Sequence, residues 1–399
     1  MSQSEQWRDL FELDPERIFM DNLLLVSHPK PVREAIEAHR QQFDRAPGEY
    51  WWDQVERVDA EVYEACGRYL GVSPREIVLT DSATMGLGLF YSGFDFKKGD
   101  EVVLSDQEHY SCVHAVDTAC QRFGVSKKTI KLYRDPWNVT EESLVQNLMS
   151  QISPATRIVA MTWVHSSTGV KLPIASMGRA IKALNQERPE DRRMFFVVDG
   201  VHGFGIEHKT MPQLECDGFI TSCHKWLFGP RGTGLMWLTP ALGEHMYSVI
   251  PTYDIQYFDQ FVRQKTRGDT AFGRRLTPGG FHSFEHRWAL PSAIQLHEDI
   301  GRPVIEQEIH RLAAYLKAGL RKISGIQVMT PKDQSLSSGL VCFERAGWTP
   351  GEVVSHLKSK GILATVTPYF KEYARLSPGI YNSLAECDRV LDAISTMDS

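Results

Sequence analysis

Short apolar segments rich in β-branched side chains recur along the first 240 residues, and helical or loop-like segments separate most of them. Segments of this kind are typical of strands that are buried on both faces. Their alternation with helices predicts an α/β fold, in which a mainly parallel sheet of the seven-stranded type is covered by helices on both faces. The expected strands span residues 76–80, 101–105, 129–133, 157–164, 195–200, 218–222 and 234–238.

The chain on either side of these segments has a different pattern. Apolar residues at helical spacing predict two helices before the first strand, over 31–43 and 51–71. After the last strand, a long amphipathic helix over 302–324 opens a region that indicates a compact α+β domain. Its further expected elements are strands at 326–330, 339–344, 362–366 and 373–377, a helix at 349–361 and a last helix from about Leu384.

This change of pattern places a domain boundary near residues 281–290. We therefore expect an N-terminal arm over 1–40, a large domain over 41–285 and a small C-terminal domain over 286–399. Because the small domain must close against the large one, we expect the arm to pack with the small domain.

Charge and composition exclude several classes of function. A net charge of −6 argues against a nucleic-acid partner. No apolar run has the length of a signal-peptide core or a membrane span, so we expect a cytoplasmic protein without a membrane partner. The cysteines form no CxxC pair, which predicts reduced thiols and no metal site. They are Cys66, Cys112, Cys120, Cys216, Cys223, Cys342 and Cys387.

Four groups of polar residues lie where strands of the predicted sheet end. In an open α/β sheet, ligands bind beyond the carboxyl ends of the strands, so these groups mark a candidate site. The groups are Asp199 at the end of 195–200; Ser222, His224 and Lys225 after 218–222; Ser82, Ala83 and Thr84 after 76–80; and His165, Ser166, Ser167 and Thr168 after 157–164.

Each group alone also has a purely structural interpretation. The segment 81–84 is a good N-cap for any helix, Asp199 can cap a turn, and a lone lysine is usually solvated. A lysine, a carboxylate and a helix N-terminus at one sheet edge are much less expected by chance. Together they describe pyridoxal 5′-phosphate (PLP) chemistry, in which the lysine forms a Schiff base, the acid pairs with the pyridinium nitrogen and the helix binds the phosphate.

Two motifs carry a resemblance to a known family. "VVDGVHGFG" followed by "SCHKWLFGPRGTG" resembles the class V, fold-type I PLP enzymes, whose pattern is D-G-A-H-x-x-G and then H-K-W/F-x-x-x-P-x-G-x-G. Within that group, "HSSTGVKLPI" and "ARLSPGIYNS" are similar to the isopenicillin N epimerase-like branch, which is related to the cysteine desulfurases. The resemblance covers nearly the whole chain. It implies a PLP cofactor, the fold-type I architecture and PLP binding by the large domain.

The resemblance also implies a role for each matching residue. Lys225 would carry the internal aldimine, Asp199 would keep the ring nitrogen protonated, and Arg375 would bind a substrate α-carboxylate. His109 would stack on the ring, with Tyr110 as the alternative. The remaining expected cofactor contacts are His202 and Ser166 at the ring or its 3′-oxygen, and Ser82, Ala83, Thr84, Ser222 or Thr221, and His224 at the phosphate.

The chain departs from the family pattern at three places. The loop "ILATVTPYFKEYAR" holds no cysteine where the desulfurases carry their nucleophile, and Cys342 lies in an expected strand, which argues against persulfide formation. The N-terminal loop "DNLLLVSHPKP" is bulkier than the glycine-containing loop of relatives. "TPGGFHSFEHRW" replaces a G-T-R motif whose threonine reaches the partner subunit's phosphate. The resemblance implies a homodimer with interfacial active sites, and His282 and Ser283 are the candidates to cross over.

For the reaction, we expect chemistry at the Cα of an amino acid or amino-acid-like substrate through an external aldimine and a carbanion, of the epimerase or β-lyase type. Lys225 can serve one face; the candidates for the opposite face are His109 and His165 as catalytic groups and Tyr110 and His282 as substrate-binding groups. Two alternatives stay open. One is a biosynthetic enzyme that decarboxylates its amino acid or oxidises it with O2, and the other is a catalytically silent PLP-fold binding module.

Overall fold

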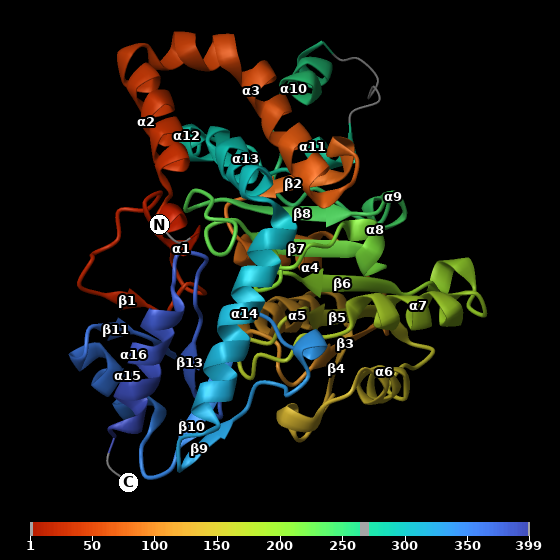
Figure 1. Ribbon diagram of the computed structural model, residues 1–399. Coiled ribbons are helices and arrows are strands. Elements are labelled where there is room, and N and C mark those ends of the chain that lie inside the picture. Colours follow the sequence, from red (N-terminus) through yellow and green to blue (C-terminus); the bar gives the residue numbers. More distant parts are fainter. Residues whose placement is uncertain (1–2, 264–270, 398–399) are drawn as a thin grey trace.

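The computed structural model describes residues 3–263 and 271–397. Residues 1–2, 264–270 and 398–399, which belong to the predicted arm, large domain and small domain, lie outside the described residues. Seven strands form a central sheet in the order β2-β8-β7-β6-β5-β3-β4 (Figure 1). They are β2 (Ile77–Thr80), β3 (Glu101–Ser105), β4 (Ser126–Ile130), β5 (Thr156–Thr162), β6 (Phe195–Asp199), β7 (Gly218–Ser222) and β8 (Gly234–Leu238).

This sheet is parallel apart from β8, which pairs antiparallel with both of its neighbours, β2 and β7. The pairings β3–β4, β3–β5, β5–β6 and β6–β7 are all parallel. The carboxyl ends of the strands other than β8 therefore lie at one edge of the sheet. The predicted mainly parallel α/β sheet is confirmed.

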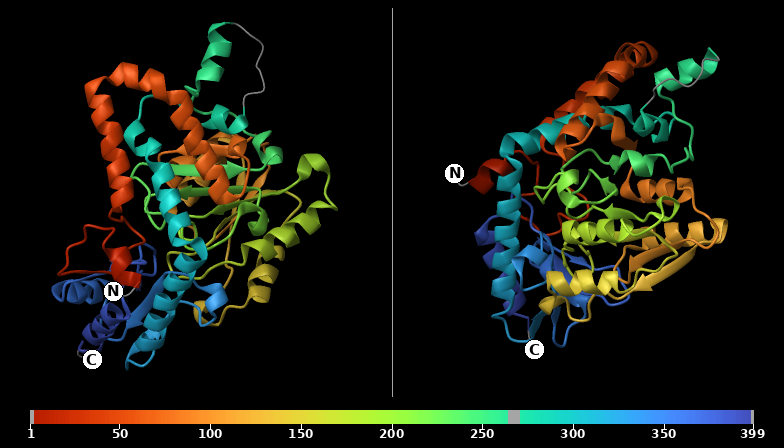
Figure 2. Two further views of the ribbon diagram at one scale, coloured as in Figure 1. Left: turned by 45° about the horizontal axis from the view of Figure 1, so that its top comes forward. Right: turned by 90° about the vertical axis from the view of Figure 1, so that its right-hand side faces the viewer.

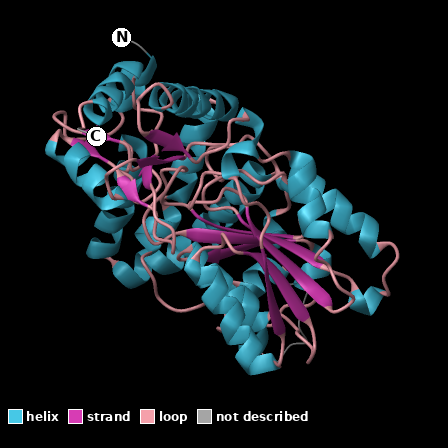
Figure 3. Ribbon diagram, turned by 90° about the horizontal axis from the view of Figure 1, so that it is seen from below, coloured by secondary structure: helices cyan, strands magenta, loops and turns pink. Residues whose placement is uncertain are grey.

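Alternate residues of each strand enter two different cores. In β5, Val159 and Met161 pack on one face, whereas Ile158 and Ala160 pack on the other. This period of two explains why the inner strands are apolar at most positions, whereas the edge strand β4 is mostly polar and exposed. Figure 3 shows helices on both sides of the fan of strands. The second face is covered by α4 (Ala83–Gly93) and α5 (Tyr110–Phe123), and the first by α3 (Pro47–Leu70), α6 (Glu141–Met149), α7 (Ile174–Asn185) and α13 (Leu290–Ile300).

One helix, α10, projects from the molecule and has no buried residue (Figure 2). It is one of the remaining helices before the C-terminal part, most of which are short. They are α1 (Gln3–Arg8), α2 (Lys30–Arg45), α8 (Met211–Leu214), α9 (Pro240–Gly243), α10 (Ile255–Val262), α11 (Phe272–Leu276) and α12 (Phe284–Trp288). Single 3-10 turns lie at Pro74–Glu76, Pro136–Asn138, Glu190–Arg192 and Gln334–Leu336. Within the described part of the chain, no helix has both the length and the apolar character that crossing a membrane requires.

A smaller antiparallel sheet lies in the C-terminal part, in the order β12-β13-β10-β9. Helices α14, α15 and α16 bury their apolar faces against it. A separate strand of the N-terminal arm, β1 (Ile18–Phe19), pairs in parallel with β11 (Ile362–Leu363), so the arm lies beside the C-terminal part. The other elements are α14 (Arg302–Leu320), β9 (Ile326–Val328), β10 (Val341–Arg345), α15 (Pro350–Ser359), β12 (Thr365–Val366), β13 (Ala374–Leu376) and α16 (Leu384–Ser395).

Two predicted strands differ from those observed. The strand expected at 129–133 is displaced to Ser126–Ile130, because it pairs with β3 in a register that ends at Ser105 opposite Ile130. The strand expected at 362–366 is divided between β11 and β12. The first part pairs with the N-terminal arm and the second with β13, so one continuous strand could not serve both partners.

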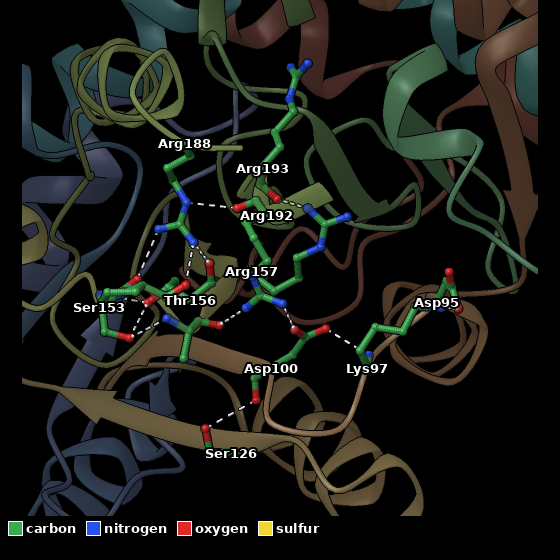
Figure 4. A network of polar contacts seen from close by, with 12 residues as sticks. Asp95, Lys97, Asp100, Ser126, Ser153, Thr156, Arg157, Arg188, Arg192 and Arg193 are labelled. Atoms are coloured by element: carbon green, nitrogen blue, oxygen red, sulfur yellow. Dashed lines mark hydrogen bonds and ion pairs between the residues drawn. The ribbon is translucent and has the colours of Figure 1, made fainter. Parts of the chain in front are cut away.

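A polar network closes the amino edge of the central sheet (Figure 4). Arg192 Nη1 lies 2.8 Å from Oδ1 of the buried Asp100, just before β3. The guanidinium of Arg188 donates to the carbonyl oxygens of Ser153 at 3.0 Å and Thr156 at 2.8 Å, at the start of β5. Charged groups at this edge are thus engaged in holding the strands together. The candidate site lies at the opposite edge.

Candidate active site

A cavity of about 210 Å³ lies at the carboxyl edge of the central sheet. Because β2, β3, β5, β6 and β7 all end there, the residues that follow them meet around one space. Arg375 reaches the same space from β13 of the smaller sheet. The predicted site residues that line the cavity are Ser82, Ala83, Thr84, His109, Ser166, Asp199, His202, Ser222, His224, Lys225 and Arg375.

Lys225 lies in a closely packed turn directly after β7. Phe228, which is fully buried, has a left-handed backbone with φ of 57°, and its N–H donates to the carbonyl of Lys225 at 2.9 Å. The N–H of Gly229 donates to the carbonyl of Cys223 at 2.8 Å, and a Cβ at Gly229 would lie 2.8 Å from that oxygen. Only glycine fits this close approach. The turn therefore fixes the backbone from which Lys225 enters the cavity.

The amine of Lys225 is available to a ligand. Burial lowers its pKa to about 8, although the nearby Asp199 carboxylate raises it, and Arg375 lowers it further. Among the described residues, the amine forms no hydrogen bond or ion pair. A lysine with a lowered pKa and a free amine has the properties of a nucleophile.

Asp199 ends β6 and is buried in the cavity wall. Burial raises its pKa to about 6, while the N–H of Val201, which donates to Oδ1 at 3.1 Å, and the charge of Lys225 lower it. Within the described chain, it forms no ion pair. Its carboxylate therefore keeps the capacity to accept a hydrogen bond from a protonated ring nitrogen.

The N-terminus of α4 opens at the same cavity. Ser82 is the N-cap, and its Oγ accepts the N–H of Met85 at 3.1 Å. The N–H of Ala83 donates to Ser222 Oγ at 2.7 Å, whereas the N–H of Thr84 has no acceptor among the described residues. A free amide, neighbouring hydroxyls and the positive end of the helix dipole fit a phosphate group.

His109 and His202 are neutral imidazoles in the cavity wall. The Nδ1 of His109 accepts the N–H of Ser111 at 3.4 Å, and that of His202 accepts the indole N–H of Trp226 at 3.5 Å. Because an indole N–H can only donate, the proton of the neutral His202 ring lies on Nε2, whereas the Nδ1 of His109 also lies 2.8 Å from Ser111 Oγ, with which it can either donate or accept. Burial lowers the pKa of both rings, and the charge of Lys225 lowers them further.

The guanidinium of Arg375 is buried without a carboxylate partner. Its Nη1 donates to the carbonyl of Ser166 at 2.6 Å and its Nε to Thr365 Oγ1 at 3.1 Å. In the described part of the chain, no Asp or Glu pairs with it, and burial lowers its pKa. A buried guanidinium without an anion is costly, and its planar fork matches a ligand carboxylate.

Some of the predicted site residues do not line the cavity, among them His165, Tyr110 and His282. His165 is completely buried, its Nδ1 lies 2.7 Å from the hydroxyl of Tyr133, and burial lowers its pKa to about 3. Tyr110 begins α5 with 70% of its surface exposed. His282 lines a different cavity of about 40 Å³, between α3 and the turn before α12. The positions of these residues within this chain give no support to the catalytic role expected for His165 or the substrate contacts expected for Tyr110 and His282.

Sequence reasoning missed several residues of the cavity wall. Thr162 pairs with Asp199 in the register of β5 and β6, and its N–H and hydroxyl both donate to the buried carboxyl of Glu108. Burial raises the pKa of Glu108 to about 7, although these hydrogen bonds lower it. Leu23 and Leu24 line the cavity from the N-terminal arm. Both residues belong to the bulky loop "DNLLLVSHPKP", and the departure of this loop from the family pattern could have indicated that they lie at the site. The other unpredicted wall residues are Ser111, Val201 and Pro368.

Fold and cavity together define a class of protein. A lysine, a carboxylate and a helix N-terminus around the carboxyl edge of a mainly parallel sheet form the cofactor site of fold-type I PLP enzymes. Residues 53–390 match the aminotransferase class-V family, to which the chain therefore belongs. The chain is a PLP-dependent enzyme, and the predicted family, fold and cofactor are confirmed.

The proteins to which the chain is similar include isopenicillin N epimerases, probable cysteine desulfurases and a cystine C–S lyase. An isopenicillin N epimerase of Streptomyces clavuligerus is 23% identical over 404 residues, which cover 98% of each chain. A probable cysteine desulfurase of Vibrio cholerae is 25% identical and covers 83% of this chain and 80% of its own. The solved complex of the cystine C–S lyase C-DES with cysteine persulfide has a TM-score of 0.86 at 20% identity, covering 96% of this chain and 99% of that one.

No cysteine is among the described residues that line the cavity. Cys342 lies in β10 directly opposite Arg375 of β13, with no exposed surface. Burial raises the pKa of its thiol to about 12, although the charge of Arg375 lowers it. A buried thiol that stays protonated is a poor nucleophile.

Proposed function

We propose that this enzyme transfers a proton at the Cα of an amino acid or amino-acid-like substrate, in a reaction of the epimerase or β-lyase type. The observation that carries the proposal is that one cavity contains both the buried, acid-free guanidinium of Arg375 and the unpaired amine of Lys225. The guanidinium suits an α-carboxylate. The amine, with a pKa near neutrality, suits the proton on the adjacent carbon.

In this proposal, Lys225 is the attachment point of PLP and, when released, the base that takes the Cα proton. Asp199 accepts a hydrogen bond from the ring nitrogen and keeps it protonated. Bound PLP supplies the ring that withdraws electrons from Cα. The proposed remaining contacts are His202 and Ser166 at the ring or its 3′-oxygen, and Ser82, Ala83, Thr84, Ser222 and His224 at the phosphate.

The group on the opposite face of the substrate decides between the two reaction types. Of the four side chains expected for that face, we propose His109, because it lines the cavity and the other three do not; it donates the proton from its protonated ring. A proton returned from His109 would invert Cα, whereas loss of a Cβ substituent would give β-elimination. A covalent persulfide on this chain is not part of the proposal, since no described cysteine reaches the cavity.

We also propose that the enzyme is a homodimer, with the second copy covering the surface around α10. Tyr253 and Phe281 lie 6.4 Å apart between ring centroids, and Trp51 lies 5.9 Å from Phe281, so these three rings form one cluster, in which Tyr253 lies just before α10 in the chain. Large apolar surfaces of this kind mark protein interfaces. The α10 surface consists of the exposed side chains of Trp52, Tyr253, Phe258, Phe261, Val262 and Phe281.

Solvent deuterium exchange tests the proposed reaction. The PLP-loaded enzyme is incubated with a panel of L- and D-amino acids in D2O, and deuterium at Cα is measured by mass spectrometry and NMR. We expect exchange with at least one amino acid, and its loss by several powers of ten in Lys225→Ala. Release of carbon dioxide from a substrate that keeps its Cα proton would contradict the proposal.

A further inference from the structure

A second cavity of about 350 Å³ lies beside the first at the carboxyl edge of the central sheet. Its walls come from the segments that follow β3, β4 and β5 and from the loop between β12 and β13. Tyr133, Tyr369 and Tyr373 supply aromatic surface, and Lys131, Arg134 and Lys371 supply positive charge. No residue of this cavity takes part in the function proposed above.

The two cavities are separated by a wall that is one residue thick. Ser166 and Pro368 line the first cavity, whereas the next residues in the chain, Ser167 and Tyr369, line the second. The hydroxyls of Ser166 and Tyr369 lie 2.6 Å apart across this wall. The carbonyl oxygen of Ser166 also accepts a hydrogen bond from Nη1 of Arg375. The wall between the cavities is therefore in direct contact with Arg375, the residue proposed to bind the α-carboxylate.

The charge of the second cavity favours an anion. Lys371 lies 3.1 Å from Glu344, and Asp106 is the acidic residue of the lining. Among the described residues, neither Lys131 nor Arg134 forms an ion pair. Two exposed cations without a partner thus line a cavity in which Asp106, the carboxylate among the described lining residues, cannot neutralise both of them.

We propose that this second cavity is a subsite for the far end of the substrate side chain, and that it selects side chains that end in a carboxylate. The inference rests on the proposed function, because it places the α-carboxylate at Arg375. For this, the hydroxyl contact between Ser166 and Tyr369 has to open; the side chain then lies between these two residues, packs its methylene groups on the tyrosines and places its terminal carboxylate near Lys131 and Arg134. The substrate class is therefore an α-amino acid with a second, distant carboxylate.

Binding of simple carboxylates tests the subsite without any turnover. Straight-chain dicarboxylates from glutarate to suberate and monocarboxylates of the same chain length are titrated into the PLP-loaded enzyme by calorimetry. Both series can use Arg375, so the ratio of their affinities isolates the distal contact. We expect one dicarboxylate to bind about tenfold more tightly than its matched monocarboxylate, since each of the two exposed cations contributes a severalfold gain.

The variant Lys131→Gln/Arg134→Gln should abolish this preference, and the control Lys358→Gln, an exposed lysine on α15, should keep it. Equal affinities of the two series, or a preference that survives the double substitution, would overturn the proposal. The deuterium-exchange experiment reports separately on the reaction. A dicarboxylate preference supports the subsite even if no amino acid exchanges its Cα proton, and exchange without the preference overturns the subsite alone.

Discussion

Lys225 and Asp199 share one cavity, and burial moves both of their pKa values toward neutrality. The pKa of the amine is lowered to about 8 and that of the carboxyl raised to about 6, and each charge limits the shift of the other. At pH 7, about one tenth of such an amine is unprotonated, against roughly three parts in ten thousand for an ordinary lysine. This larger neutral fraction makes Lys225 suited to carry a carbonyl cofactor and to accept a proton.

The role of Arg375 predicts a specific kinetic defect. Arg375→Ala should raise the KM for the exchanging amino acid about a hundredfold, because the substrate loses two charge-assisted hydrogen bonds. Arg375→Lys should raise it less, since the charge remains but the planar fork is lost. The affinity for PLP should change less than about twofold. Steady-state exchange kinetics and a PLP titration measure these quantities.

Cys342→Ala provides the matched control, because Cys342 is buried opposite Arg375 in the neighbouring strand. It should leave the KM unchanged. An unaltered KM in Arg375→Ala would show that the α-carboxylate binds elsewhere. A loss of activity in Cys342→Ala at unchanged fold would restore a role for a cysteine.

At the scale of elements, the buried carboxylate of Glu207 connects segments that are distant in the chain. It lies 2.6 Å from the amine of Lys171, 2.7 Å from Nε2 of His310 in α14 and 2.6 Å from the hydroxyl of Ser338. Burial alone would raise its pKa, but these partners lower it to about 2. The loop that follows Asp199 at the end of β6 is thereby fixed to α14 and to the C-terminal part.

Glu207→Gln should lower the free energy of unfolding by about 3 kcal/mol at pH 7, because the substitution leaves the partly buried Lys171 without its partner. The folded-state pKa of Glu207 lies below its unfolded value of about 4.5, so its contribution is complete above pH 5 and declines as the pH falls toward 2. The difference between wild type and variant should therefore shrink by about 1 kcal/mol between pH 7 and pH 4. Urea unfolding at the two pH values measures it.

Glu306→Gln is the control for this experiment, since Glu306 lies close to Glu207 and His310 and is less buried than Glu207. It should cost less than about 1 kcal/mol at pH 7. A Glu207→Gln variant as stable as wild type, or equally destabilised at both pH values, would contradict the assigned ion pair.

The strand ends and their chemistry were predictable because they depend on local pattern. Apolar strands separated by helices imply a parallel sheet, and a parallel sheet gathers residues such as Asp199, Ser222 and Thr84 at one edge. The motif around Lys225 then identified the cofactor. The burial of His165 outside the cavity was not predictable from its place after β5. Its N–H donates to the carbonyl of Val170 at 2.8 Å, so the chain turns back there and the ring is buried beside Tyr133.

Contacts between distant parts of the chain could not be predicted in the same way. Leu23, Leu24 and Pro368 reach the cavity only because β1 pairs with β11 across almost the full length of the chain. The second cavity depends on the loop between β12 and β13 lying against the segment after β4. The limits expected for the three domains stay a prediction.

At the scale of the whole molecule, the α10 surface predicts the oligomeric state. Phe258 and Phe261 are 58% and 79% exposed on a helix that buries none of its own residues. The variant Phe258→Glu/Phe261→Glu should convert a dimer into a monomer, because two buried charges would replace two aromatic rings at the interface. Size-exclusion chromatography with light scattering measures the molar mass.

Phe370→Glu serves as the control, since Phe370 is fully exposed in a different loop, between β12 and β13. It should leave the molar mass unchanged. A wild-type enzyme that is monomeric at micromolar concentration would refute the proposed homodimer, and a double variant that stays dimeric would place the interface on another surface.

The account as a whole depends on Lys225 as the residue that holds PLP, and borohydride reduction tests it most directly. The PLP-saturated enzyme is reduced with borohydride and digested, and the pyridoxyl group is located by mass spectrometry. The account predicts one modified peptide, with the pyridoxyl group on Lys225, and an unmodified protein for Lys225→Ala. A pyridoxyl group on another lysine, or none on the wild-type chain, would contradict it.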